Sequence, residues 1–198
     1  LRAECHIQSA VTSVCSIGGR FLVTGSSDCT VSLWRVSFKG DENDDIEISP
    51  VSSSSFHSDE VVTVCGCYEN GLVVSLDKKN VLVFETILNA KFINFVDLNS
   101  GKEIVDRKSV LKTKIIVFKS GIVAVSQIDR VFFFDSHGKK IYTWMIQNCD
   151  EIVEMRKFYD CDTREILIVG CRNKEKTRIC SFDLTTFRQT VTKLTDKC

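Results

Sequence analysis

A unit of about fifty residues recurs along the chain. Three segments, 22–34, 72–84 and 122–134, align without a gap, and each runs from one apolar stretch through a short polar turn to a second apolar stretch. Nine anchor residues keep a spacing of 50 between copies: Leu22, Leu72 and Ile122; Val31, Val81 and Val131; Trp34, Phe84 and Phe134. A fourth copy, 166–183, has a longer turn. This period predicts stacked units that bury their flanks against one another.

Each repeat has room for four strands. Another apolar stretch precedes each pair, and a more polar one follows it, while no segment sustains the 3.6-residue period of a helix. Four sequential antiparallel strands make one blade of a β-propeller. We therefore predict an all-β fold, a propeller fragment of about four four-stranded antiparallel blades that spans the whole chain. The expected blades are approximately 6–56, 57–110, 111–148 and 149–195.

The longest polar stretch lies in the first repeat. Residues 40–45 are rich in Asp and Glu, and the run Ser52–Ser55 follows shortly after. Composition of this kind is typical of a solvated loop, so we expect an excursion around the outer strand of the first blade. A phosphorylated acidic-serine loop is the alternative interpretation.

Composition narrows the functional classes. The 26 basic and 26 acidic side chains balance, which disfavours a nucleic-acid partner or a basic membrane-binding face. The ten cysteines contain no C-x-x-C pair, and several lie in apolar strands, which predicts reduced thiols in a cytoplasmic chain with no metal site. No apolar run approaches the roughly 18 residues of a membrane span. The chain begins inside a repeat, so we expect a fragment of a longer protein.

The first repeat resembles a WD40 repeat. The resemblance rests on Gly25-Ser-Ser-Asp28, on Val31-Ser-Leu-Trp34, and on His6 and Val11 upstream. In that family a histidine, a hydroxyl residue, an aspartate and a tryptophan form a buried hydrogen-bonded tetrad. The resemblance assigns these roles to His6, Thr24, Asp28 and Trp34. His6 lies one residue further from Val11 than the family pattern has it.

The later repeats depart from the WD40 tetrad. Ungapped alignment gives the second copy His57, but it places Val74, Lys78 and Phe84 at the other three positions. The third copy has Ala124, Ile128 and Phe134 there. The sequence therefore predicts that both copies have lost the tetrad and are held by blade packing alone.

Several longer sequence segments are similar to the C-terminal WD40 propellers of BEACH-domain proteins. They are Leu22–Val36, Gly71–Ser75, Gly121–Ser126 and Phe134–Ile141. The resemblance implies a scaffold of membrane or vesicle trafficking, in the cytoplasm and peripheral to intracellular membranes, with a BEACH domain upstream in the same protein.

No catalytic, cofactor-binding or metal-binding motif stands out. The adjacent residues Asp135-Ser-His137 do not suit a Ser-His-Asp triad, because neighbours in sequence rarely face one another as a triad requires. We predict a non-enzymatic scaffold that binds proteins or peptides on one propeller face, with no cofactor, no nucleic acid and no membrane insertion. The alternatives are a substrate-receptor or regulatory subunit of another cytosolic complex, such as a ubiquitin ligase or a signalling adaptor, and an enzyme built on a propeller.

Overall fold

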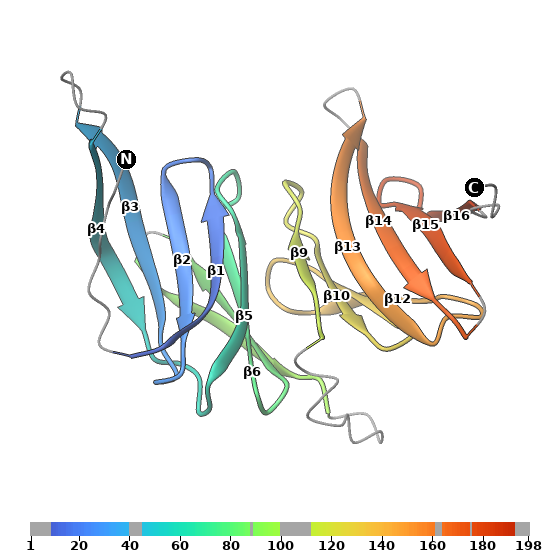
Figure 1. Ribbon diagram of the computed structural model, residues 1–198, viewed down its shortest axis with the longest axis horizontal. Helices are drawn as coiled ribbons and strands as arrows, with labels where there is room; N and C mark the ends of the chain where they lie inside the picture. The colour runs from blue at the N-terminus through green and yellow to red at the C-terminus, as the bar shows by residue number, and fades with distance from the viewer. Residues whose placement is uncertain are drawn as a thin grey trace.

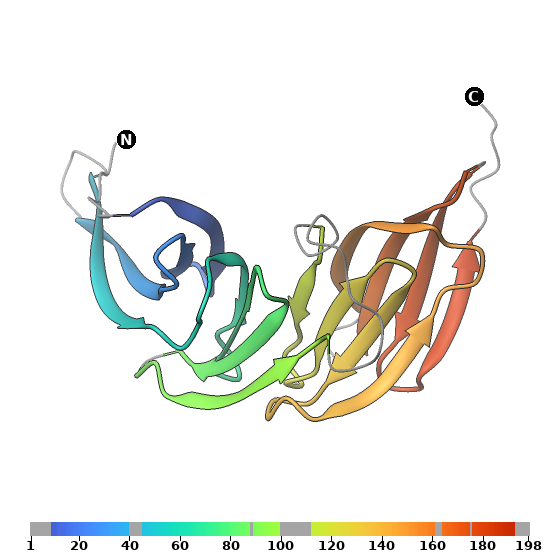
Figure 2. The same ribbon diagram turned by 90° about the horizontal axis from the view of Figure 1, so that it is seen from below.

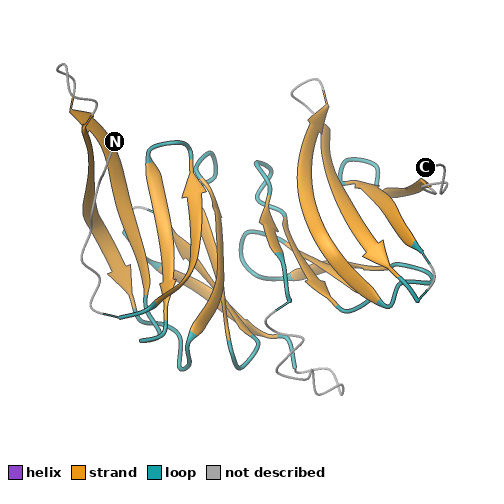
Figure 3. Ribbon diagram, viewed as in Figure 1, coloured by secondary structure: helices purple, strands orange, loops and turns teal. Residues whose placement is uncertain are grey.

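The structure is a computed structural model that describes residues 9–39, 45–87, 89–99, 112–160, 164–174 and 176–192. These residues form strands, turns and loops but no helix (Figure 3). Accordingly, the described part of the chain contains no helix that could cross a membrane.

Within these described ranges, sixteen strands form four sheets of four strands each, and strand order in each sheet follows chain order (Figure 1). We call these sheets blades one to four. Blade one contains β1 (Val11–Ile17), β2 (Phe21–Ser26), β3 (Val31–Lys39) and β4 (Asp45–Ser54). Blade two contains β5 (Val61–Cys67), β6 (Leu72–Asp77), β7 (Val81–Thr86) and β8 (Phe92–Asp97). Blade three contains β9 (Ile115–Val117), β10 (Val123–Gln127), β11 (Arg130–Phe134) and β12 (Lys140–Met145). Blade four contains β13 (Glu151–Asp160), β14 (Arg164–Arg172), β15 (Thr177–Asp183) and β16 (Arg188–Thr192).

All neighbouring strands within a blade pair antiparallel. The prediction of an all-β fold with four four-stranded antiparallel sheets is therefore confirmed. The blades stand side by side in an open arc (Figure 2). The first strand of each blade lies on the concave side, where β1 contacts β5 and β9 contacts both β5 and β13.

The hydrophobic core is divided among the three contacts between blades. Ile17, Val23 and Leu33 of blade one pack with Val61 and Val73 of blade two. A second cluster joins blades two and three, and a third joins blades three and four. In the third cluster the rings of Phe133 and Phe182 stack with centroids 4.8 Å apart. Each blade thus buries its apolar side chains against the next blade.

The two terminal blades each have one flank without a neighbour in the arc. In β-strands, alternate side chains face opposite ways, so Val14 and Trp34 lie on the flank of blade one that faces away from blade two. Val14 is 61% exposed and Trp34 is half-buried. On the corresponding flank of blade four, Phe158 is 51% exposed and Ile179 is 40% exposed.

Glycine permits the closest approach between blades one and two. A Cβ atom on Gly25 would lie 2.5 Å from Val61 Cγ1, and a Cβ atom on Gly66 would lie 2.3 Å from Ile17 Cδ1. No real Cβ makes contacts this short, so these positions accept a larger residue only if the neighbouring side chain moves.

The interpretation of Ser52–Ser55 as loop is wrong for its first three residues. Ser52 to Ser54 belong to β4, where they pair with β3. The physical reason is the position of β4 at the outer edge of its sheet, since an edge strand buries less apolar surface and tolerates polar residues. Pro50 sits in the same strand beside a register shift, as proline does at sheet edges. Asp45, the last residue of the acidic stretch, also belongs to β4, and residues 40–44 lie outside the described residues.

Candidate binding site

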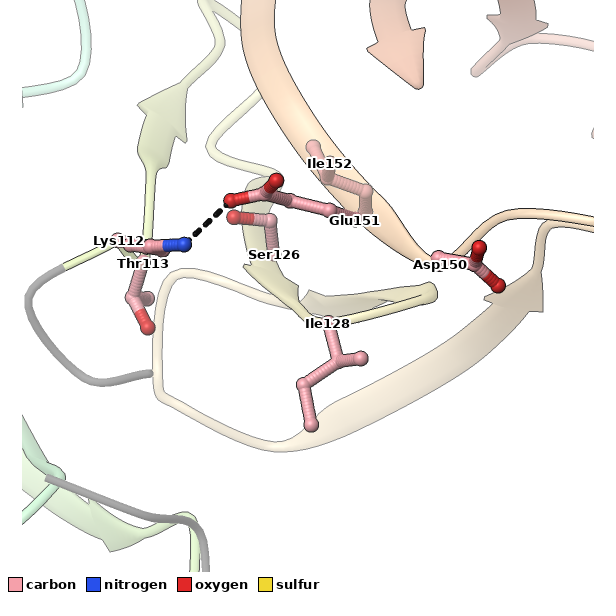
Figure 4. Close-up of a pocket in the computed structure, with 7 residues that line it drawn as sticks. All are labelled: Lys112, Thr113, Ser126, Ile128, Asp150, Glu151 and Ile152. Atoms are coloured by element: carbon pink, nitrogen blue, oxygen red, sulfur yellow. Dashed lines mark hydrogen bonds and ion pairs between the residues drawn. The ribbon is translucent and has the colours of Figure 1, made fainter. Parts of the chain in front are cut away.

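A pocket of about 340 Å³ lies between blades three and four. We call it the Ile128 pocket. It is formed by the segment leading into β9, the β10–β11 turn and the start of β13 (Figure 4). Its lining consists of Lys112, Thr113, Ser126, Ile128, Asp150, Glu151 and Ile152. Two blades and three separate stretches of chain therefore build it.

One wall of the pocket is a fixed cluster of charges. Lys112 Nζ donates to Glu151 Oε1 over 2.6 Å, and Arg172 Nη2 donates to Glu151 Oε2 over 2.5 Å. The hydrogen bonds from Lys112 first, and then from Arg172, lower the pKa of Glu151 to about 2. Glu151 therefore remains a carboxylate at neutral pH, with both oxygens engaged.

The opposite side is apolar and its backbone is strained. Ile128 is 51% exposed and has φ of 47°, in the left-handed region that β-branched residues avoid. Among the described non-glycine residues with positive φ, it is the β-branched one; the others are Cys29, Asn80, Ala90, Asn148 and Phe187. Figure 4 shows its side chain projecting from the β10–β11 turn, away from the Lys112–Glu151 pair.

Backbone hydrogen bonds from blade four and from the end of blade three hold this turn in place. The backbone N–H of Ile152 donates to the Ile128 carbonyl over 2.9 Å, and that of Ile146 donates to the Asp129 carbonyl over 3.0 Å. A left-handed non-glycine residue costs about 1–2 kcal/mol, so these contacts offset a local penalty. The turn is therefore presented rigidly at the pocket.

Two polar groups of the pocket can still form hydrogen bonds with a ligand and would orient it. Asp150 Oδ2 accepts the backbone N–H of Lys174, whereas Asp150 Oδ1 receives no hydrogen bond from the described residues. The Lys112 side chain is 65% exposed and donates one hydrogen bond, to Glu151. The pocket can thus offer one acceptor, one cationic donor and one apolar contact to a ligand.

A second pocket, of about 640 Å³, opens at the other ends of the strands in blades one and two. Its lining consists of Arg20, Phe21, Arg35, Val36, Ser37, Phe38 and Tyr68. The β1–β2 turn contributes Arg20 and the β5–β6 turn contributes Tyr68. By strand direction, these turns lie on the opposite face from the β10–β11 turn. The two faces of the arc therefore carry different surfaces.

The structure brings two of the four tetrad candidates together. Trp34 Nε1 donates to Thr24 Oγ1 over 2.9 Å. Asp28 is exposed and accepts hydrogen bonds from the hydroxyl groups of Ser9 and Thr30, both over 2.6 Å. These bonds, with that of Ser9 the largest, lower the pKa of Asp28 to about 2. His6 lies outside the described residues. Asp28 thus caps its own turn and does not join the Thr24–Trp34 pair.

Blade two contains a buried network that sequence alignment missed. His57 Nε2 lies 2.7 Å from Ser75 Oγ, and His57 Nδ1 lies 3.2 Å from Asp77 Oδ2. The Asp77 carboxylate only accepts, so Nδ1 carries the proton that points to it, while the Ser75 hydroxyl can serve Nε2 as donor or as acceptor. Asp77 Oδ1 also accepts the backbone N–H groups of Lys79 and Val81, each over 3.0 Å.

The second copy thus lacks the tryptophan of the tetrad, as predicted from its sequence, but it is not held by blade packing alone, because it contains this network. A shift of one residue accounts for the hydroxyl position, and the acid Asp77 lies at the position that Ser26 has in blade one. Three residues separate the paired Ile17 and Phe21 in blade one, whereas four separate Cys67 and Leu72 in blade two. Beyond that turn, equivalent positions lie 51 residues apart, and not 50. Thr24 then corresponds to Ser75, and Trp34 corresponds to Glu85.

The network has the bonding pattern of a Ser-His-Asp triad but is closed to solvent. Ser75 is fully buried, and the side chains of His57 and Asp77 are each 1% exposed. A substrate cannot reach Ser75 without opening the blade, so the arrangement stabilises the fold. Nearby, Glu85 is 3% exposed, and its Oε1 has no hydrogen-bond partner. Burial raises the pKa of Glu85.

The sequence Asp135-Ser-His137 forms a turn. Asp135 Oδ1 accepts the backbone N–H groups of His137 and Lys139, each over 2.9 Å. The carboxylate therefore caps the turn and does not orient the imidazole. Ser136 Oγ lies 3.3 Å from His137 Nδ1 in an exposed position.

Comparison with solved structures defines the class of fold. The chain is similar to BamB from Moraxella catarrhalis, with a TM-score of 0.61 and 12% sequence identity, over 98% of this chain and 53% of that one. It is also similar to the computationally designed Ika4 protein, with a TM-score of 0.57 and 18% identity, over 98% and 96% of the two chains. The chain thus has a β-propeller-like fold, and it spans about half the length of the BamB chain.

Sequence comparisons identify no particular family. No protein-family model matches the chain, and no curated protein matches it in sequence. The similarity to the two solved structures therefore establishes the fold, and the WD40 and BEACH resemblances stay predictions.

Proposed function

We propose that the chain is a non-enzymatic interaction platform whose Ile128 pocket binds a short segment of a partner protein. The observation that carries the proposal is Ile128 itself. An isoleucine in left-handed backbone destabilises the turn, and its side chain recovers little by burial because half of it remains exposed. Strain of this kind often accompanies function, because contacts elsewhere maintain it.

The surroundings of Ile128 suit a peptide. An extended or turned peptide presents apolar side chains together with backbone N–H and C=O groups. Ile128 would contact an apolar side chain, Asp150 Oδ1 would accept an N–H, and Lys112 would donate to a carbonyl or carboxylate. The Glu151 cluster is already paired, so it supplies a rigid wall that needs no rearrangement on binding.

The test separates binding from stability by replacing Ile128 with asparagine, which tolerates left-handed backbone better. A phage-displayed library of random linear peptides would be selected against the immobilised chain, and selected peptides would be measured by fluorescence polarisation. We expect Ile128→Asn to weaken binding at least about tenfold, which is about 1.4 kcal/mol. The same variant should gain about 1 kcal/mol in free energy of unfolding, because the backbone strain is relieved.

Ile141→Asn is the matched control, since Ile141 is 42% exposed on the outer strand β12 and does not line the pocket. It should leave peptide binding unchanged. Lys112→Ala should weaken binding without the gain in stability. Selected peptides that bind wild type and Ile128→Asn equally well, or that respond to Phe38→Asp in the second pocket instead, would contradict the assignment of this pocket.

The sequence segments that resemble WD40 propellers of BEACH-domain proteins support a more specific proposal. On their resemblance, we propose that the chain is part of a WD40 propeller at the C-terminus of a cytoplasmic BEACH-domain protein that acts in membrane or vesicle trafficking. The alternative is a substrate-receptor or regulatory subunit of another cytosolic complex. Reading the parent protein upstream of Leu1 separates them, because a BEACH domain there supports the first and a different catalytic or adaptor domain supports the second.

A further inference from the structure

The contact between blades one and two shows how one blade of this chain covers the next. Four apolar side chains of blade two enter it, each at most 5% exposed: Val61, Val64, Val73 and Ile87. Blade one receives them with apolar side chains and with Gly25, because a Cβ atom on Gly25 would lie 2.5 Å from Val61 Cγ1. The contact therefore has an entering side, on blade two, and a receiving side, on blade one.

The uncovered flank of blade one repeats the entering side. The strands β1 and β5 each have a register shift directly after their first paired residue, so Val11 corresponds to Val61. Continued along the two blades, this register gives the equivalents of the four entering residues as Val11, Val14, Leu22 and Val36. All four are apolar, yet Val11 is 44% exposed, Val14 is 61% exposed, and the other two are half-buried. Blade one thus presents an entering side that no blade of the described chain covers.

The uncovered flank of blade four repeats the receiving side. Gly170 pairs with the residue directly after the register shift of β13, as Gly25 does with that of β1. Among the described residues, a Cβ atom on Gly170 would meet only the Glu154 backbone, at 3.9 Å or beyond, so the space in front of Gly170 is open. In the same register, the receiving residues Ile17, Phe21, Val23 and Val31 correspond to Phe158, Ile166, Ile168 and Ile179.

The charged side chains on this flank of blade four lie beside its apolar residues and are paired. Arg156 Nη2 lies 3.6 Å from Glu154 Oε2 on the inner edge strand β13. Arg164 Nη2 lies 2.5 Å from Asp183 Oδ2 at the ends of β14 and β15. One position departs from the receiving side of blade one, since Ser181 replaces a leucine. An apolar centre with polar groups around it is the usual composition of a protein interface.

The chain thus contains both sides of one contact, at opposite ends of the arc (Figure 2). A second copy can supply to each end the side that this end lacks. The length of the chain agrees with this arrangement, since the chain covers 53% of the BamB chain, and two copies are therefore about as long as that chain. Ika4 is matched over 96% of its length, so a fold of about this size occurs as a whole chain.

We propose that two copies of this chain close head to tail into one ring, with blade one of each copy packed on the uncovered flank of blade four of the other. Val11 of one copy would then enter the space in front of Gly170 of the other, as Val61 does at Gly25. A two-fold rotation makes the same contact twice and leaves no terminal blade uncovered. This pairing is independent of the peptide binding proposed for the Ile128 pocket, which lies between blades three and four.

The first measurement is the mass of the purified chain in solution. Sedimentation velocity in a reducing buffer, over a wide range of concentration, separates one copy of 22.4 kDa from two. We expect a reversible dimer whose Tm rises with protein concentration, because association stabilises the folded chain by mass action.

Two charge substitutions test which flanks meet. Val14→Glu places a carboxylate on the entering side, and Ile179→Glu places one on the receiving side. A carboxylate buried without a partner is costly, so each variant alone should raise the dimer dissociation constant at least about a hundredfold. An equimolar mixture of the two variants should associate more tightly than either alone, because one of its two contacts then joins unaltered flanks.

Gly170→Ile tests the close approach without adding a charge. The isoleucine fits the isolated arc but fills the space that Val11 needs, so the variant should be monomeric with an unchanged circular dichroism spectrum. Phe95→Glu is the matched control, since Phe95 is 63% exposed on β8 of blade two, away from both terminal flanks. This control should dimerise like the wild type.

Four results would overturn the proposal. A wild-type chain that stays monomeric at every concentration would assign the two flanks to further blades of a longer protein. A dimer that survives either Val14→Glu or Ile179→Glu would mean that a flank packs on its own counterpart. A mixture of the two variants that associates no better than its components would exclude the head-to-tail contact. Assemblies larger than two copies would mean that this contact does not close into a ring.

Discussion

Removal of the Asp77 carboxylate should destabilise the chain far more than removal of the Asp28 carboxylate, although the sequence favours Asp28 as the structural acid. Asp77 is 1% exposed and Asp28 lies in an exposed turn. The comparison is Asp77→Ala in blade two against Asp28→Ala in blade one.

The expected magnitudes follow from the groups left without a partner. Asp77→Ala would leave the buried His57 ring nitrogen unpaired inside the blade and would remove the acceptor of the backbone N–H groups of Lys79 and Val81 in the adjoining turn. Breaking a buried charged contact from one side costs about 3–5 kcal/mol. Asp28→Ala exposes its former donors to water, which replaces the lost bonds, so we expect a cost of about 1 kcal/mol or less.

The assay is urea unfolding followed by circular dichroism, with Tm from calorimetry as a second readout. For a chain of this length, the cost at Asp77 corresponds to a fall in Tm of roughly 10 °C, and that at Asp28 to a few degrees. Equal losses for the two variants would refute the reasoning, because buried and exposed carboxylates would then contribute alike. A larger loss for Asp28→Ala would show that blade one contains the principal network.

Two further substitutions test the core. Glu85→Gln should raise the free energy of unfolding at neutral pH by about 1–3 kcal/mol, because it removes a buried carboxylate whose Oε1 lacks a partner. Because the pKa of Glu85 is raised in the folded chain, this carboxyl destabilises the wild type least below its unfolded-state pKa, and wild-type stability falls as pH rises through the folded-state pKa. The advantage of the variant should therefore disappear near about pH 4, which a series of denaturant melts at different pH values would measure. Gly66→Ala should cost about 1–3 kcal/mol, because the new methyl group would overlap Ile17, and Ile17→Val should recover part of the loss in the double variant if that overlap is the cause.

The fold could be predicted because it repeats. The apolar residues Val31, Val81 and Val131 recur at equal spacing, and a pattern present in several copies is recognisable even where one copy has an unusual composition. The edge strand β4 was harder to foresee, since Ser52 to Ser54 look like a loop when their pairing with β3 is unknown.

The buried network depended on a turn length that the alignment ignored. One extra residue between Cys67 and Leu72 moves the hydroxyl position to Ser75. The same offset places Lys79 at the position of Asp28, and Asp77 corresponds to Ser26 of blade one. A signal was available, because His57 lies upstream and both Ser75 and Asp77 are polar residues within an apolar stretch. A gap of one residue in the alignment would have found Ser75, whereas Asp77 would still have fallen two residues before the acid position.

The Ile128 pocket could not be read from the sequence. Its walls come from three connections that only tertiary packing brings together, and the left-handed backbone of Ile128 leaves no trace in residue type.

The uncovered flanks of the two terminal blades have a consequence for how the arc comes apart. Blades two and three each gain burial from two neighbours, whereas blades one and four gain it from one. In a linear array of this kind, stability is shared through contacts between neighbours, so opening starts at the outermost members and spreads inward. Whatever covers Trp34 at one end, or Phe158 and Ile179 at the other, would therefore suppress fraying throughout the array and not merely at the point of contact.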